Sequence, residues 1–222
     1  MKKNLKWGMM PAFALSLCLA ADVGYAKSGP KGKSGNSTVE YEADLEPVIV
    51  APAIAAVEPN AGGDVRYRKQ IHKGTTKTER FEAKVRIPFP SAALGIVDTA
   101  SAQAADVQLF LSSATTPTVY YATCALDLTG IETEFEDGAA QTFAVYKVDV
   151  RKELRNRALR QREIHGVCDV DVVTAEAQNG TPVPADHDIA TAAVVTTTPP
   201  VAPATTPTIV STVFLSGELE LD

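Results

Sequence analysis

Apolar and polar residues alternate with a period of two over much of the chain, the pattern of β-strands that bury one face and expose the other. The clearest run extends from Phe81 to Ile87, where Glu82, Lys84 and Arg86 separate the apolar positions. It ends before a proline, which cannot donate a hydrogen bond to a sheet ladder. The same alternation predicts further strands over residues 41–50, 64–72, 107–111, 120–128, 142–152, 164–172 and 213–221.

Turn-forming residues separate these predicted strands, for example at 136–138 (EDG) and at 178–182 (QNGTP). Short alternating strands joined by such turns are typical of antiparallel all-β folds. We therefore expect an all-β chain of about eight to ten strands. The expected architecture is an antiparallel β-sandwich, and a small up-and-down or Greek-key barrel is the alternative.

The N-terminus has the pattern of a secretory signal peptide. Three lysines precede an apolar segment, Trp7–Ala21, and small residues stand at Gly24 and Ala26. The apolar segment is short for a membrane span. We therefore expect residues 1–26 to be a signal peptide, the protein to be exported to the periplasm or the cell exterior, and no transmembrane segment to follow cleavage.

Composition divides the rest of the chain into a leader and one domain. Residues 27–38 are rich in Gly, Ser and Lys and contain almost no apolar side chain, which predicts a flexible leader. Residues 39–222 then form a single β-sandwich domain. Within it, the Pro- and Thr-rich segment 196–208 is expected to be a loop, because a strand-like segment follows it.

Two cysteines, Cys124 and Cys168, occupy apolar positions of their predicted strands, so both side chains are expected to face the core. The third, Cys18, lies inside the predicted signal peptide. An even number of cysteines in an exported chain favours a disulfide over a catalytic or metal-bound thiol. The sequence therefore predicts a Cys124–Cys168 disulfide.

The charge balance limits the possible partners. The formal net charge is −6, and removal of residues 1–26 leaves 18 basic and 26 acidic residues. A negative chain is repelled by phosphate backbones, which argues against a nucleic-acid-binding protein. The expected partner is therefore an unknown protein or a surface polymer.

One segment departs from this acidic balance. Residues 151–163 (RKELRNRALRQRE) combine six basic side chains with two glutamates. One interpretation is a patch that binds phosphate or carboxylate groups, since guanidinium groups bind both well. The other is a hairpin tip, or one or two helical turns, whose charges contact only water. The candidate residues are Arg151, Lys152, Arg155, Arg157, Arg160 and Arg162.

Two groups of residues have side chains that metal ions prefer. The first is Asp186-His187-Asp188, to which the fold could add His165, although the spacing does not require these donors to converge. The favoured interpretation of this segment is a polar turn before a strand. The second group is acidic, but its first members alternate with apolar residues and there is no calcium-loop motif, so we expect an outward strand face. Its members are Glu132, Glu134, Glu136 and Asp137.

No motif for nucleophilic catalysis is present, such as the G-x-S-x-G elbow, and no cofactor is expected. The leading hypothesis is therefore a secreted or periplasmic, non-catalytic protein with a binding, interaction or structural role in the cell envelope. The first alternative is a small extracytoplasmic metal-binding protein. The second is a hydrolase whose pair of carboxylates the sequence does not reveal.

Overall fold

A computed structural model describes residues 36–49, 56–136, 139–155, 158–170, 182–198 and 208–222. All of them belong to the unit Gly32–Asp222. Over these residues the chain forms twelve β-strands and one short α-helix. They are β1 (Asn36–Pro47), β2 (Gly62–His72), β3 (Thr75–Pro88), α1 (Thr99–Ala104), β4 (Asp106–Ser112), β5 (Tyr120–Ala125), β6 (Asp127–Glu136), β7 (Ala139–Arg155), β8 (Ala158–His165), β9 (Val167–Val170), β10 (Ile189–Thr198), β11 (Thr208–Glu218) and β12 (Glu220–Leu221).

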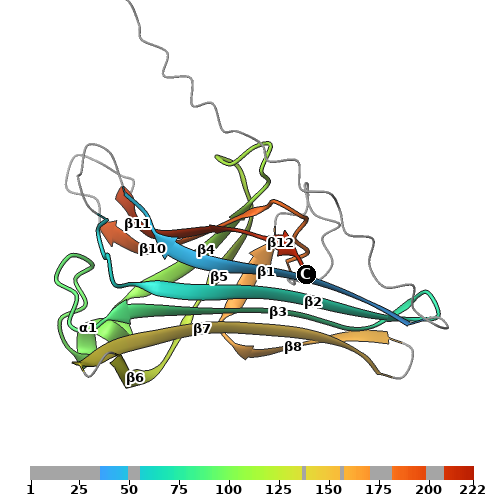
Figure 1. Ribbon diagram of the computed structural model, residues 1–222, viewed down its shortest axis with the longest axis horizontal. Helices are drawn as coiled ribbons and strands as arrows, with labels where there is room; N and C mark the ends of the chain where they lie inside the picture. Colours follow the sequence, from blue (N-terminus) through green and yellow to red (C-terminus); the bar gives the residue numbers. More distant parts are fainter. Residues whose placement is uncertain (1–35, 50–55, 137–138, 156–157, 171–181, 199–207) are drawn as a thin grey trace, which may run out of the picture. The chain divides into compact units, whose positions relative to one another are not determined.

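The strands form one antiparallel sheet that curls into a half-barrel (Figure 1). Its main path has the order β6-β7-β3-β2-β1-β11-β10-β4-β5-β9, while β8 pairs with β7 and β12 pairs with β1. The predicted all-β class is confirmed. The expected sandwich of two separate sheets differs from this path, because β1 pairs with both β2 and β11 and so joins the two halves.

Alternation of buried and exposed residues builds the core on the concave face. In β3, Phe81 and Ile87 are fully buried, and the charged residues between the apolar positions are partly exposed, as the sequence predicts. Large side chains from the other strands, and from Leu219 between β11 and β12, complete this core, since apolar area removed from water is the main stabilising contribution. Those that are fully buried include Tyr67, Tyr146, Phe214, Leu109, Leu111, Leu215 and Leu219.

The helix α1 is a local structure that the alternation did not predict. Asp98 caps its first turn by accepting a hydrogen bond from the Ser101 backbone N–H, at 2.7 Å. Ala102 is fully buried, and its carbonyl accepts a hydrogen bond from the Tyr146 hydroxyl at 2.8 Å. Burial of that hydroxyl raises the pKa of Tyr146 to about 12.

Two predicted strands are each divided by a corner. The run 120–128 becomes β5 and β6, and the run 164–172 becomes β8 and β9, although each alternates without interruption in the sequence. The corners lie next to each other, because the Gly166 N–H donates a hydrogen bond of 2.6 Å to the Asp127 carboxylate. Gly166 has a φ of 60°, a conformation that glycine adopts without strain. Each corner therefore carries the chain from one end of the curled sheet to the other.

The predicted disulfide is confirmed. Cys124 of β5 lies directly opposite Cys168 of β9, and their sulfur atoms are bonded. Both residues are buried, as expected from their apolar positions. The bond therefore fixes the short strand β9 to β5.

The predicted limits of the signal peptide, the leader and the Pro/Thr segment can be compared with the ends of the described strands. β1 begins at Asn36, so the last three residues assigned to the leader, 36–38, lie in a strand. Residues 196–198 and 208 of the Pro/Thr segment also lie in strands, and its other residues, like residues 1–26, are outside the described ranges. Within those ranges, no helix is long and apolar enough to cross a membrane.

Candidate protein interface at the β6–β8 edge

Two strands lie end to end along one side of β7. β6 pairs with β7 from Ala139 to Lys147, and β8 pairs with β7 from Asp149 to Arg155. Both run antiparallel to β7, so they point in the same direction (Figure 1). Over the residues that the structure describes, neither has a second partner strand. Their outer side, here called the β6–β8 edge, therefore presents backbone N–H and C=O groups that no other described strand pairs.

The β8 half of this edge is basic on the convex face of the sheet. Arg151 of β7 lies directly opposite Arg162 of β8, and Glu153 lies opposite Arg160. With Arg155, these residues form the hairpin patch, which has four arginines and one glutamate on the same face. Like charges directly opposite each other on neighbouring strands are destabilising. Such a patch is therefore a candidate for contact with a negatively charged partner.

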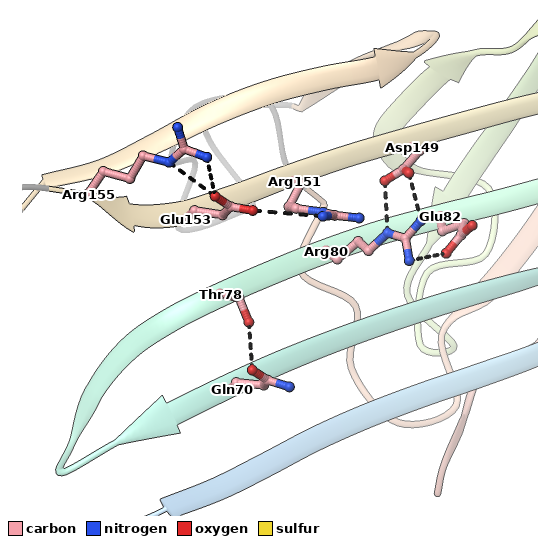
Figure 2. A network of polar contacts seen from close by, with 8 residues as sticks. All are labelled: Gln70, Thr78, Arg80, Glu82, Asp149, Arg151, Glu153 and Arg155. Carbon is pink, nitrogen blue, oxygen red and sulfur yellow. Dashed lines mark hydrogen bonds and ion pairs between the residues drawn. The ribbon is translucent and has the colours of Figure 1, made fainter.

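Glu153 is the centre of the hairpin patch, and Figure 2 shows it between Arg151 and Arg155. It accepts hydrogen bonds from Arg155 Nη2 at 2.8 Å and Nε at 3.2 Å, and lies 3.8 Å from Arg151 Nη1. The hydrogen bond from Arg155, together with the neighbouring arginine charges, holds the pKa of Glu153 below its ordinary value. The exposed side chains of Arg160 and Arg162 make no hydrogen bond or ion pair within the described part of the chain.

The β6 half of the edge is acidic on the same convex face. Glu132 lies 3.7 Å from Lys84 Nζ, and Glu134 accepts a hydrogen bond of 2.9 Å from Arg86. These two members of the acidic run form the outward strand face that the sequence predicts. The side chain of Glu136 and residue Asp137 are outside the described part.

A part-buried ion pair supports the edge at the position where β6 ends and β8 begins beside β7. Arg80 of β3 donates to both carboxylate oxygens of Asp149, through Nε at 2.9 Å and Nη2 at 2.7 Å (Figure 2). Its Nη1 also lies 3.0 Å from Glu82. The hydrogen bonds to Asp149 raise the pKa of Arg80. Because Asp149 is only 7% exposed, this bidentate pair fixes the middle of β7 against β3.

Lys152 does not belong to the hairpin patch. It lies on the concave face, buried, with Nζ 3.5 Å from the Glu79 carboxylate. The other oxygen of Glu79 accepts a hydrogen bond of 2.5 Å from the Tyr67 hydroxyl. Burial, and then that bond, raise the pKa of Tyr67 well above its ordinary value. Sequence position groups Lys152 with the arginines of the basic segment, but alternation puts it on the opposite face, since it is one residue away from both Arg151 and Glu153. Arg157 is outside the described residues.

Three of the four candidate metal ligands have other partners. Asp188 is buried and accepts hydrogen bonds of 2.8 Å from the Tyr121 hydroxyl and the Ala185 N–H. His187 Nδ1 lies 2.5 Å from Glu218, and this contact, with the charge of Asp186, raises the pKa of His187.

The other two candidates do not complete a site. Asp186 accepts a hydrogen bond of 3.0 Å from the Leu221 N–H, and His165 lies on β8, opposite Asp149. All four candidates are among the described residues, where no group of three or more His, Cys, Asp or Glu side chains is arranged to hold a metal ion. The polar turn is the interpretation that this geometry favours.

The edge itself was not among the sites predicted from the sequence. Its signal is present, since an acidic strand, 132–136, and a basic strand, 158–163, flank the long strand 139–155. Alternation does not predict that both of these strands pair with the same side of the long strand. Comparisons with protein-family models, with curated proteins and with solved structures found no match to this chain. The geometry of the β6–β8 edge therefore carries the functional conclusion.

Proposed function

We propose that this chain is an exported, non-catalytic interaction protein of the cell envelope that binds a protein partner along the β6–β8 edge. One observation carries the proposal. Two strands that no other described strand pairs on their outer side lie end to end along β7, and their convex faces have opposite charge. Glu132 and Glu134 lie on one, and Arg160 and Arg162 lie on the other.

Strand addition is the mode of binding that this edge supports. An added strand gains main-chain hydrogen bonds along the edge, and the side chains that alternate on each face determine which strand fits. Opposite charges on the two halves then fix the direction and register of the incoming strand, because a reversed strand would oppose like charges. Arg160 and Arg162 are exposed and have no ion pair with another described residue, so contacts with an added strand would break no ion pair in that part of the chain.

Export is supported by two independent features. The N-terminal sequence has a basic start, an apolar segment and small residues at the expected cleavage site. The Cys124–Cys168 disulfide is a bond that persists in oxidising compartments and is rare in the cytosol. Both features support the proposal that the folded domain functions outside the cytoplasm.

Site-specific cross-linking tests the proposed function. A photo-cross-linking amino acid is introduced at Ala158 on the edge, or at Gln70 on β2 as the control, because both are exposed and Gln70 lies on a strand paired on both sides. The full chain is expressed with its own signal. We expect a protein adduct at Ala158, absent at Gln70 and lost when Arg160→Glu and Arg162→Glu are added.

Two outcomes would contradict the proposal. The first is the same adducts at both positions, or none at Ala158. The second is binding of the purified protein to an anionic polysaccharide, lost in the same double variant and accompanied by no protein adduct. In that case the hairpin patch serves a surface polymer.

A further inference from the structure

We infer that the partner is a second copy of this chain, and that two β6–β8 edges pair about a two-fold axis perpendicular to the sheet. This inference rests on the proposed function and names its partner. In the pair, β6 of each copy adds to β8 of the other. The curled sheet then continues from one copy into the next with both convex faces on the same side.

Strand direction permits this pairing. β6 and β8 both run antiparallel to β7 and thus parallel to each other. A two-fold axis perpendicular to the sheet reverses the direction of every strand in the second copy. β6 therefore meets β8 of the second copy as an antiparallel partner, and the same contact occurs twice, as a closed two-fold interface requires.

The two halves of the edge also match in length. β7 has 17 residues, and Lys147 is its middle residue. On one side, β6 from Gly130 to Glu136 lies opposite β7 from Val145 to Ala139. On the other, β8 from His165 to Ala158 lies opposite β7 from Asp149 to Arg155. A two-fold axis through the edge beside Lys147 thus sets residues 131–136 of one copy opposite residues 163–158 of the other, residue for residue. Nearer the axis, β8 has one extra residue between Glu163 and His165.

In this register the charges are complementary. Glu132 is opposite Phe143, and Arg162 is opposite Arg151, so both lie four positions from Lys147. Glu134 and Arg160 both lie six positions from it, opposite Gln141 and Glu153. The pairing therefore sets Glu132 against Arg162 and Glu134 against Arg160 of the second copy, and each pair occurs twice.

The backbone supports the same pairs. In an antiparallel sheet, the peptide groups of successive residues point alternately to the two neighbouring strands, in step with the side-chain faces. β7 pairs with β3 from Phe143 to Glu153 with no register shift, so this alternation is continuous along it. Residues of β6 and β8 on the convex face therefore present their peptide groups in the same orientation. Glu132 and Arg162 of the second copy can therefore lie directly opposite each other with their peptide groups in compatible orientations, as antiparallel pairing requires.

The residues on the concave face support the proposed pairing only in part. The same register sets Phe135, whose side chain is 80% exposed, opposite backbone position 159 of the second copy, since both lie seven positions from Lys147. It sets Thr133 opposite Gln161, whose side-chain oxygen is buried and has no hydrogen-bond partner in the described part of the chain. It also sets Ile131 opposite Glu163, a pair that adds no attraction.

The alternative role of edge charges is to prevent pairing. Natural sheets protect an exposed edge with charged side chains, often lysine, which keep other strands away. Charges of one sign repel a second copy wherever it approaches. The β6–β8 edge instead carries both signs on its convex face, at equal distances from its centre, so that Glu132 and Glu134 each meet an arginine of a second copy.

A charge-exchange experiment tests the inference on the full chain, exported with its own signal and purified. One double variant carries Arg160→Glu and Arg162→Glu, and the other carries Glu132→Arg and Glu134→Arg. Sedimentation velocity should give a dimer for the original protein and a monomer for each variant alone. A mixture of the two variants should give a one-to-one dimer, because each edge then meets an edge of opposite sign. For each variant alone, we expect the dimer dissociation constant to rise about a hundredfold or more.

The matched control is Arg66→Glu with Arg68→Glu, which makes the same charge change on β2, a strand enclosed by β1 and β3. It should leave the dimer intact. A protein that stays monomeric, while the adduct at Ala158 contains a different protein, overturns the inference and leaves the proposed function standing. No dimer and no adduct overturns both. Dimers of either charge variant alone, with native circular dichroism, show that another surface mediates association.

Discussion

Replacing Gly166 with alanine perturbs the corner at which β8 passes into β9. A Cβ at this position would lie within 3.0 Å of the Ala125 carbonyl oxygen, closer than Cβ atoms approach backbone in real structures. The φ of 60° adds the cost of holding alanine in the left-handed region, about 1–2 kcal/mol. Overpacking against a fixed backbone contributes a further ~1–3 kcal/mol. We therefore expect Gly166→Ala to lower the free energy of unfolding by about 2–5 kcal/mol.

Two other glycines separate these contributions. Gly95 has a φ of 72° with no heavy atom within 4 Å of a built Cβ, so Gly95→Ala isolates the conformational cost. A Cβ on Gly217 would crowd the Asp44 carbonyl, but no left-handed φ applies there, so Gly217→Ala isolates the steric cost. The assay is urea unfolding followed by far-ultraviolet circular dichroism, with the disulfide intact. If Gly166→Ala is no more destabilising than Gly95→Ala, the close approach of the two corners is refuted.

Three further changes should have measurable effects on the stability of the fold. The disulfide joins residues 44 positions apart and so restricts the unfolded chain. Its reduction should lower the unfolding free energy by up to ~4 kcal/mol, and equal stability with and without reductant would contradict this. Arg80→Met leaves the buried Asp149 carboxylate without its bidentate partner and should cost about 2–3 kcal/mol, while the exposed Arg66→Met should cost less than ~0.5 kcal/mol. Because contact with Glu218 raises the pKa of His187 above 6.5 in the folded state, its contribution to stability is fully present below pH 6.5 and is lost as pH rises through the folded-state pKa. Thermal unfolding across this range should therefore show a pH-dependent decrease that His187→Gln removes.

Local alternation predicted most of the strands, because burial of one face imposes a period of two wherever a strand covers a core. It predicted the disulfide for the same reason, since Cys124 and Cys168 both occupy buried positions. It could not place the two corners. At Leu126 and Gly166 the chain changes its neighbours while the apolar parity continues, so the runs 120–128 and 164–172 look like single strands in the sequence.

The candidate site depends on pairings between residues far apart in the sequence, which alternation does not encode. The basic segment 151–163 was visible, but only the strand positions separate Lys152, on the concave face, from the arginines on the convex face. The acidic run beginning at Glu132 was visible too, and was correctly expected to face outward. That both runs share one side of β7 follows from the order of the sheet alone.

The corners also explain why the two halves of the edge are collinear. β6 begins at Asp127 and β8 ends at His165, so both strands reach the centre of β7 and there turn toward the other end of the sheet. The hydrogen bond from Gly166 to Asp127 joins the turns, and the disulfide between β5 and β9 fixes the segments beyond them. The bidentate Arg80–Asp149 pair holds β7 at the same position from the other side. An edge whose charges must meet a second copy in one register needs this rigidity, since a loosely held strand would lose in conformational entropy much of what its ion pairs contribute.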